Sequence, residues 1–257
     1  MNLRHIFILP ALLAAMACSD DSPVTPDTPD TPEGPDITNS VEKLVSIDAG
    51  QTFQTIAGFG ASDCWSPAFV GKSWTSHRAG ITELLFSSEI VGGKPKGIGL
   101  SQWRVNLGGG SAAQGEACGI EDKSRRAESY LTDDLTYDWT RCEGQRYFMD
   151  RAKELGCNNF VLFSNTPPVQ YTYNGKGFSA RGGLSNLKPE HYGDFAGYMA
   201  DVAARYTGEG YHISHISPVN EPQYNWDSGQ EGSGWTNDEV AALARELDMS
   251  LLSLIHI

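Results

Sequence analysis

Four short apolar segments, each followed by an amphipathic pattern, constrain the fold of this chain more than any other feature. We expect strands at residues 55–60, 99–106, 159–164 and 212–217, and helices at residues 77–86, 141–155, 189–206 and 237–247. In one of these helices, Phe148, Ala152 and Leu155 recur at helical spacing. The alternation predicts a parallel sheet with right-handed crossovers.

The spacing of these strands indicates how much of a fold the chain contains. Successive strands lie roughly 50 residues apart, against about 30 per unit in a typical eight-unit barrel. Four units use the whole chain, so the sequence predicts the N-terminal half of a (β/α)8 TIM barrel over residues 41–257, truncated at its C-terminus. The mostly apolar run at residues 249–257 lacks a stop signal and favours truncation; the alternative is an ordinary C-terminal helix.

The run SPVNEP at residues 217–222 follows the last expected strand. In parallel β/α proteins the chemistry lies where strands end. Asn220 can hydrogen-bond a substrate hydroxyl and Glu221 can carry a proton, while Pro222 excludes right-handed helical backbone at Glu221. Taken alone, this run could equally be a strand-to-helix turn capped by Asn and broken by Pro.

The strand around residue 104 has a polar face and an apolar face. Gln102, Arg104 and Asn106 lie on one side, and Trp103, Val105 and Leu107 on the other. The polar face should point into the barrel and the apolar face toward the helices. An Arg in a barrel interior needs a carboxylate partner, which could be catalytic or any structural Asp or Glu.

Aromatic and polar residues gather after the expected strand ends. The rings are Trp65, Tyr171, Tyr173, Tyr224, Trp226 and Trp235. Such rings can stack on sugars at the mouth of a cleft, although each one singly could serve loop packing. The predicted substrate-binding residues are Asp63, Trp65, Asn165, Tyr171 and Trp226. Gly108–Gly110 lacks the Lys and Ser/Thr of a phosphate-binding loop, so we expect it to form a tight turn beside the cleft.

Four motifs occur in an order and spacing that resemble glycoside hydrolase family 30, and within it the endo-β-1,6-galactanase-like branch. They are GFGASDCW at residues 58–65, WRVNLGGGS at 103–111, FSNTPP at 163–168 and SPVNEP at 217–222. The resemblance covers roughly residues 45–248. It also implies a side β-domain, to which strand-like residues 44–53 would belong.

The resemblance implies a retaining β-glycosidase without metal or organic cofactor. Glu221 matches the acid/base, Asn220 the residue that binds the sugar 2-hydroxyl, and Arg104 the residue that orients the nucleophile. The nucleophile itself would follow the seventh strand, beyond Ile257, and the chain as it stands is expected to be inactive. Asp63 and Asp227 lie near the same rim but sit in motifs better explained as turns or substrate contacts.

We therefore expect a glycan substrate, most specifically a β-1,6-galactan. The alternatives are another family 30 activity (xylanase, glucosylceramidase-like, fucosidase or glucosidase) and a non-catalytic glycan-binding lipoprotein. Glu221 and Arg104 together argue against a binder, which needs neither a proton donor nor an Arg holding a nucleophile. Residues 1–40 hold six acidic residues and Arg4, so of the net charge of −13 only −8 falls on residues 41–257. This balance disfavours nucleic acid as a partner.

The N-terminus reads as an export signal. Residues 1–17 combine Arg4 with a short apolar run and small residues, followed by Cys18 in a context that resembles a bacterial lipobox. An acidic Ser-Asp-Asp follows Cys18, and residues 18–40 form a linker rich in Pro, Thr and Asp. We expect a lipid anchor at Cys18 that holds the protein on the outer face of a bacterial outer membrane. The alternative is an ordinary secretory signal.

The other four cysteines show no zinc-ligand spacing. Cys118 and Cys142 fall in the same long connection, which suggests a disulfide between them in an oxidising compartment. Cys157 lies beside a strand and is expected to be a buried thiol.

The N-terminal pattern makes a testable prediction. Mass spectrometry of the mature protein should find acylated Cys18 as its first residue, because the apolar run and the small residues before Cys18 match a lipoprotein signal. An unmodified N-terminus at another residue would contradict this assignment.

Overall fold

The computed structural model describes residue 46 and residues 48–254. The chain divides into two units, residues 1–54 and 55–257. In the first unit, the described residues form a turn in which Gly50 N donates to Asp48 Oδ1 (2.9 Å) and Gln51 N donates to Asp48 O (3.1 Å). The strand expected at residues 44–53 is therefore absent from the described part of that segment, since the turn interrupts it. Residues 44, 45 and 47 lie outside the described residues, as do Cys18 and the linker.

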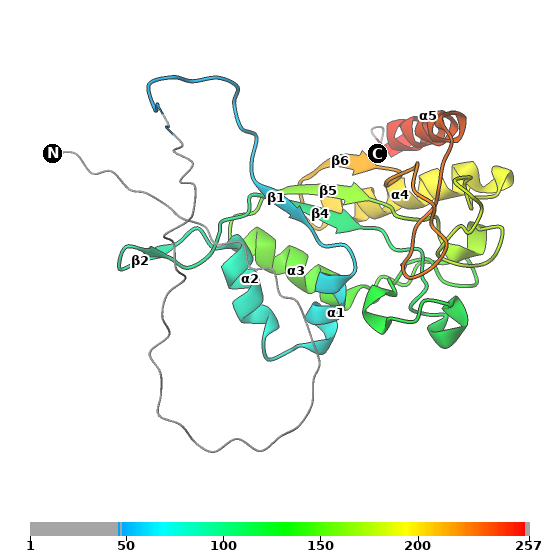
Figure 1. The fold of residues 1–257 in the computed structure, drawn as a ribbon, viewed down its shortest axis with the longest axis horizontal. Helices are drawn as coiled ribbons and strands as arrows, with labels where there is room; N and C mark the ends of the chain where they lie inside the picture. Colours follow the sequence, from blue (N-terminus) through cyan, green and yellow to red (C-terminus); the bar gives the residue numbers. More distant parts are fainter. Residues whose placement is uncertain (1–45, 47, 255–257) are drawn as a thin grey trace, which may run out of the picture. The chain divides into compact units, whose positions relative to one another are not determined.

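The second unit is built on a four-stranded parallel sheet in the order β1–β4–β5–β6 (Figure 1). Its strands are β1 (Gly60–Ser62), β4 (Gln102–Asn106), β5 (Asn159–Phe163) and β6 (Ile213–Ser217). Three of the four expected strands are confirmed, whereas the first lies later than predicted and shares only Gly60 with the expected range 55–60. Among the described residues, β1 and β6 are the edges of this sheet, so these strands form an open sheet that fits part of a barrel.

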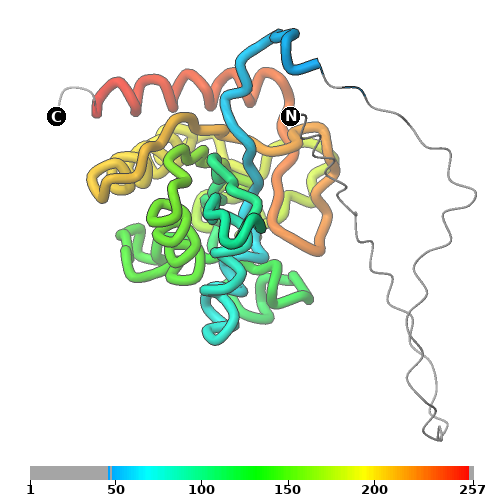
Figure 2. The backbone as a smooth tube through the Cα atoms, turned by 90° about the vertical axis from the view of Figure 1, so that its left-hand side faces the viewer, coloured from blue at the N-terminus to red at the C-terminus, as the bar shows by residue number. Residues whose placement is uncertain are grey.

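The expected helices are also present. They are α2 (Arg78–Phe86), α3 (Glu143–Glu154), α4 (Tyr192–Gly208) and α5 (Asn237–Leu254). Figure 2 shows α5 running beside α4, on which it packs. Within the part of the chain that the structure describes, none of the helices has the length and apolar character needed to cross a bilayer.

One helix and one hairpin were not predicted from the sequence. Helix α1 (Ser66–Ser73) begins with Ser66-Pro67, and Pro is favourable in the first turn of a helix. Strands β2 (Ile90–Val91) and β3 (Lys94–Pro95) form a small antiparallel hairpin. Short 3-10 turns lie at Gly115–Cys118, Lys123–Arg125, Val169–Tyr171 and Pro189–His191.

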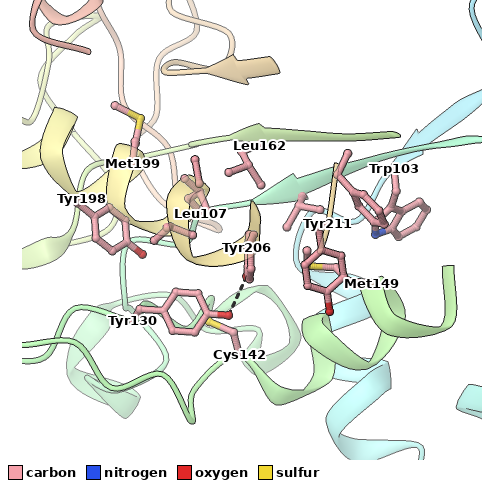
Figure 3. Close-up of a cluster of buried hydrophobic side chains, with 14 of the residues drawn as sticks. Trp103, Leu107, Tyr130, Cys142, Met149, Leu162, Tyr198, Met199, Tyr206 and Tyr211 are labelled. Carbon is pink, nitrogen blue, oxygen red and sulfur yellow. Dashed lines mark hydrogen bonds between the residues drawn. The ribbon is translucent and has the colours of Figure 1, made fainter. Parts of the chain in front are cut away.

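The apolar face of β4 packs toward the helices, as its alternation predicts. Trp103 and Val105 are buried in one core with Phe148 of α3 and Leu162 of β5. The Trp103 and Phe148 rings stack with centroids 6.3 Å apart. The same core includes tyrosines, and the hydroxyl oxygens of Tyr130 and Tyr206 are hydrogen-bonded to each other at 2.7 Å (Figure 3).

The disulfide predicted between Cys118 and Cys142 is wrong, since both are free thiols in separate surroundings. Cys118 Sγ accepts a hydrogen bond from Ile120 N at 3.2 Å within its own turn. Cys142 immediately precedes α3 in a buried position, where burial raises the pKa of its thiol. Cys157 is a buried free thiol, as expected.

Two glycines allow α1 and α3 to approach each other closely. A Cβ on Gly144 would lie 2.0 Å from Ala68 O and 2.6 Å from Lys72 N, and a Cβ on Gly71 would lie 2.1 Å from Gly144 O. All of these neighbours are backbone atoms, so they have no rotamer with which to make room. The close approach of the two helices therefore depends on the absence of a Cβ at both Gly71 and Gly144.

This contact predicts opposite effects for two Gly→Ala substitutions in helices. Gly144→Ala should lower the unfolding free energy by about 1–3 kcal/mol, because it forces backbone apart. Gly197→Ala in α4, where nothing lies within 4 Å of the added Cβ, should be neutral or raise stability by roughly 0.5–1 kcal/mol. Urea unfolding followed by circular dichroism measures both; equal stabilities for the two variants would contradict the packing argument.

Candidate active site

Arg104, the middle residue of β4, contacts polar groups of β1 and of the segment after β6. Its Nη2 donates to Asn220 Oδ1 at 2.8 Å and its Nη1 donates to Ser62 Oγ at 3.3 Å. Its guanidinium carbon lies 3.3 Å from the centroid of the Phe163 ring. Arg104 of β4 therefore reaches over β5 to the segment after β6, and also touches β1.

The hydrogen-bond partners of Arg104 are the Asn220 amide and the Ser62 hydroxyl rather than a carboxylate. Among the residues that the structure describes, no acidic side chain forms an ion pair with it, so the carboxylate expected for this Arg is not found in this part of the chain. Burial lowers the pKa of the Arg104 guanidinium, and nearby acidic groups, Asp63 and Glu221 among them, oppose that shift. The Glu221 carboxylate thus interacts electrostatically with the Arg104 guanidinium.

Glu221 stands at the exposed end of the same cluster. Its φ is +43°, on the left-handed side, which costs a non-glycine residue on the order of 1 kcal/mol. Pro222 already excludes right-handed helical backbone there. The Glu221 carbonyl accepts from Tyr224 N at 3.0 Å and Trp226 Nε1 at 3.3 Å, which holds the turn.

Three of the predicted site residues lie together in this cluster. Arg104, Asn220 and Glu221 were predicted as site residues, and the structure brings them together. An exposed carboxyl group can exchange a proton with a ligand, and an amide beside it can bind a hydroxyl. The sheet face next to them holds a hollow of about 380 Å³ lined by β1, β4 and β5, including Arg104. A larger apolar hollow of about 590 Å³ lies between α4, β6 and α5 and contains none of these residues.

Asp63 does not face this rim. It is completely buried, with Oδ1 accepting from Asn106 N (2.9 Å) and Oδ2 accepting from Gln145 Nε2 (2.6 Å). Burial raises its pKa to about 7, although the two donated hydrogen bonds and Arg104 lower it. The predicted sugar contact for Asp63 is therefore corrected to a structural role, in which its carboxylate ties β4 to α3.

The remaining predicted contacts differ in exposure. Tyr171 is buried and stacks on the His191 ring, with ring centroids 4.8 Å apart. Trp226 is buried against its own loop. The prediction that these two rings present a free face to a sugar is therefore wrong. Asn165 is buried with Oδ1 unpaired. Trp65 is half-buried, and the guanidinium carbon of Arg125 lies over its ring, 4.8 Å from the ring centroid.

Other rings from the predicted aromatic group remain open to solvent. Tyr173 is 48% exposed and Tyr224 is 57% exposed. Tyr224 meets Trp226 edge-on, with centroids 4.8 Å apart. Tyr224 thus offers accessible surface on the turn that carries Glu221. Tyr173 lies in the loop after β5, where the Arg181 guanidinium carbon is 3.8 Å from the centroid of its ring.

Glu231 was not singled out from the sequence. It is 1% exposed and accepts hydrogen bonds from Gly109 N (2.7 Å, to Oε2) and Ser111 N (2.9 Å, to Oε1). The available signal was the Gly108–Gly110 run, whose backbone N–H groups need an acceptor. Nothing in the local sequence around residue 231 identifies that acceptor. Over residue 46 and residues 48–254, no group of three or more His, Cys, Asp or Glu side chains could hold a metal ion.

Comparisons with known proteins bear on this site. Residues 42–255 match the profile described as O-Glycosyl hydrolase family 30. An endo-β-1,6-galactanase of Hypocrea rufa is 26% identical over 229 residues, covering 81% of this chain and 46% of that protein.

Two solved structures are also similar. A conserved exported protein from Bacteroides fragilis has a TM-score of 0.76 at 37% identity, covering 82% of this chain and 44% of that one. The catalytic domain of xylanase C from Talaromyces cellulolyticus has a TM-score of 0.56 at 21% identity, covering 80% and 45%, and this likeness concerns the fold alone. The chain thus spans somewhat under half the length of the relatives it matches.

The buried Asp63 predicts a characteristic pH dependence of stability. In the unfolded chain its carboxyl ionises near pH 4, whereas in the fold it stays protonated until about pH 7. The folded state then binds more protons between these values, so the unfolding free energy should fall as pH rises from about 4 to 7, by up to about 4 kcal/mol.

Asp63→Asn should make this slope shallower, whatever its constant cost in stability; Glu231, whose carboxyl pKa is also raised by burial, accounts for part of what remains. Asp248→Asn, which changes an exposed carboxylate on α5, should leave the slope intact. Urea titrations at several pH values between 4 and 8 measure it, and parallel profiles for wild type and Asp63→Asn would refute the assignment.

Proposed function

Because the chain belongs to glycoside hydrolase family 30, as its four ordered motifs predicted, we propose that it is part of a retaining β-glycosidase that cleaves β-1,6-linked galactan. The observation that carries this proposal is the exposed Glu221 at the end of β6, beside Asn220 and Arg104. The Hypocrea rufa galactanase supports the substrate class. The proposed partner is a glycan substrate.

Glu221 is the proposed acid/base. In the first step it donates a proton to the glycosidic oxygen while a second carboxylate attacks the anomeric carbon and forms a glycosyl ester. In the second step Glu221 takes a proton from water, which attacks the anomeric carbon of the ester, breaks its bond to the nucleophilic carboxylate and releases the sugar with its original configuration. An exposed carboxyl group on a rim can serve both steps, because the leaving group and then the water reach it from solvent.

Arg104 and Asn220 prepare the site for a hydroxyl. A guanidinium can only donate hydrogen bonds, so the Asn220 atom that faces Arg104 is its carbonyl oxygen, Oδ1. The Asn220 amide group is then directed away from Arg104 with both N–H donors available. In the proposed reaction it binds the sugar 2-hydroxyl, a contact that strengthens in the transition state.

The nucleophile is proposed to come from a part of the protein that this sequence does not contain. Asp63 is buried and already bound by two donors. Asp227 accepts from Asn225 Nδ2 at 2.8 Å within its own loop. In the proposal, Arg104 holds the incoming carboxylate ionised and oriented, and a lipid on Cys18 places the enzyme at the bacterial outer surface.

Replacing the acid/base tests this function in a protein that carries this chain together with the second carboxylate. Glu221→Gln should reduce turnover of a β-1,6-galacto-oligosaccharide by roughly 10² to 10⁴, the usual cost of losing general acid catalysis. An activated aryl β-galactoside should lose far less in its first step, because its leaving group needs no proton. Burst and steady-state kinetics separate the two steps.

Asp227→Asn is the matched control, since it removes another exposed carboxylate from the same loop. It should change both rates little. Equal losses on the two substrates with Glu221→Gln would show that Glu221 is not the proton donor.

A further inference from the structure

The glycine run after β4 forms a cradle of backbone N–H groups. A Cβ on Gly109 would lie 2.5 Å from Thr166 Cγ2 and 2.9 Å from Pro167 O, so the loop after β5 leaves no room for a side chain there. Gly110 has a φ of +98°, which a glycine adopts readily. The run can therefore turn its N–H groups inward, as anion-binding nests do.

The cradle is occupied by the chain's own carboxylate. Both oxygens of Glu231 are used, one by Gly109 N at 2.7 Å and the other by Ser111 N at 2.9 Å. Burial raises the pKa of this carboxyl, while the hydrogen bonds from Ser111 and Gly109 lower it. Glu231 thus connects the loop after β4 to the loop after β6, over more than a hundred residues of sequence.

The contacts continue from Glu231 to the turn that carries Glu221. Next to Glu231, Gly232 lies so close to Trp226 that a Cβ would come within 2.1 Å of the indole ring. Trp226 in turn donates from Nε1 to the Glu221 carbonyl at 3.3 Å. On the other side, Trp235 N donates to Pro222 O at 2.8 Å. The strained Glu221 turn is therefore closed by residues on both sides of Glu231.

We propose that Glu231 is a positioning residue for Glu221, acting as an internal anion that locks the loop after β6 onto the glycine cradle after β4. This inference rests on the proposed function, since positioning matters only if Glu221 transfers a proton. Glu231 itself is buried and touches no substrate. Its effect passes through Gly232 and Trp226 to the backbone of Glu221.

Glu231→Gln is the informative substitution because it keeps the shape of the side chain. A neutral amide offers one oxygen acceptor, and its NH₂ group would face a backbone N–H, so one hydrogen bond of the cradle is lost. Glu239→Gln is the matched control. Glu239 also accepts from two backbone N–H groups, Thr236 N at 2.8 Å and Ser185 N at 3.3 Å, but it is only partly buried, at the start of α5.

The kinetics are measured in a protein that carries this chain together with the second carboxylate, and the readout is the dependence of the rate on the leaving group. Glu231→Gln should lower kcat on a β-1,6-galacto-oligosaccharide by roughly tenfold or more, with KM changed less than about twofold, and should lower the rate on an activated aryl β-galactoside much less. Glu239→Gln should not change the ratio of the two rates. A variant that merely unfolds in part loses both activities equally, and that result would overturn the inference.

If Glu231→Gln does not fold, Glu231→Asp replaces it. This variant keeps the charge but is one methylene shorter, so it should show the same preference for the activated substrate. Equal losses on both substrates would again count against positioning.

Failure of the proposed function would look different, because the unaltered protein would then hydrolyse neither substrate. In that case amide hydrogen exchange decides the positioning. Glu231→Gln should speed exchange at Gly109 N, Ser111 N and the Trp226 indole, whereas Glu239→Gln should not. Faster exchange in the cradle without a change at Trp226 would show that Glu231 does not control the Glu221 turn.

Discussion

The hydrogen bond from Arg104 to Asn220 is the interaction on which the candidate site depends. It joins the middle of β4 to the segment after β6, and the Phe163 ring of β5 lies against the guanidinium. A parallel sheet makes this possible, because neighbouring strands end at the same edge. The bond also orients the Asn220 amide, so the spacing of the strands determines how a hydroxyl-binding group lies next to Glu221.

Two buried carboxyl groups hold the last residue of β4 and the loop that follows it. Asp63 accepts from Asn106 N, and Glu231 accepts from Gly109 N and Ser111 N. Both come from other loops, so the backbone that follows β4 is held from the β1 side and from the β6 side. Burying a carboxylate is costly unless it is bound in this way. The rim thus gains rigidity from groups that do not themselves face solvent.

The sequence predicted the elements of this arrangement better than the contacts between them. Alternation along β4 correctly separated Trp103 from Arg104, because side-chain direction in a strand has a fixed period of two. Tyr171 and Trp226 were expected to be open, yet rings near a cleft can equally pack against their own loops. The roles of Asp63 and Glu231 could not be predicted, because they depend on which distant N–H groups the two side chains meet. The predicted Cys118–Cys142 disulfide was wrong for the same reason, since proximity in sequence does not fix proximity in space.

The most direct measurement is a crystal structure of the catalytically complete protein with Glu221→Gln, soaked with a β-1,6-galacto-oligosaccharide. The account predicts that a sugar ring lies over the ends of β4 to β6. Its 2-hydroxyl should meet the Asn220 amide, and the scissile oxygen should lie within about 3.2 Å of the side chain at position 221. A saccharide bound elsewhere, for example in the apolar hollow beside Ile213 and Leu251, with residue 221 out of reach of any glycosidic oxygen, would contradict it.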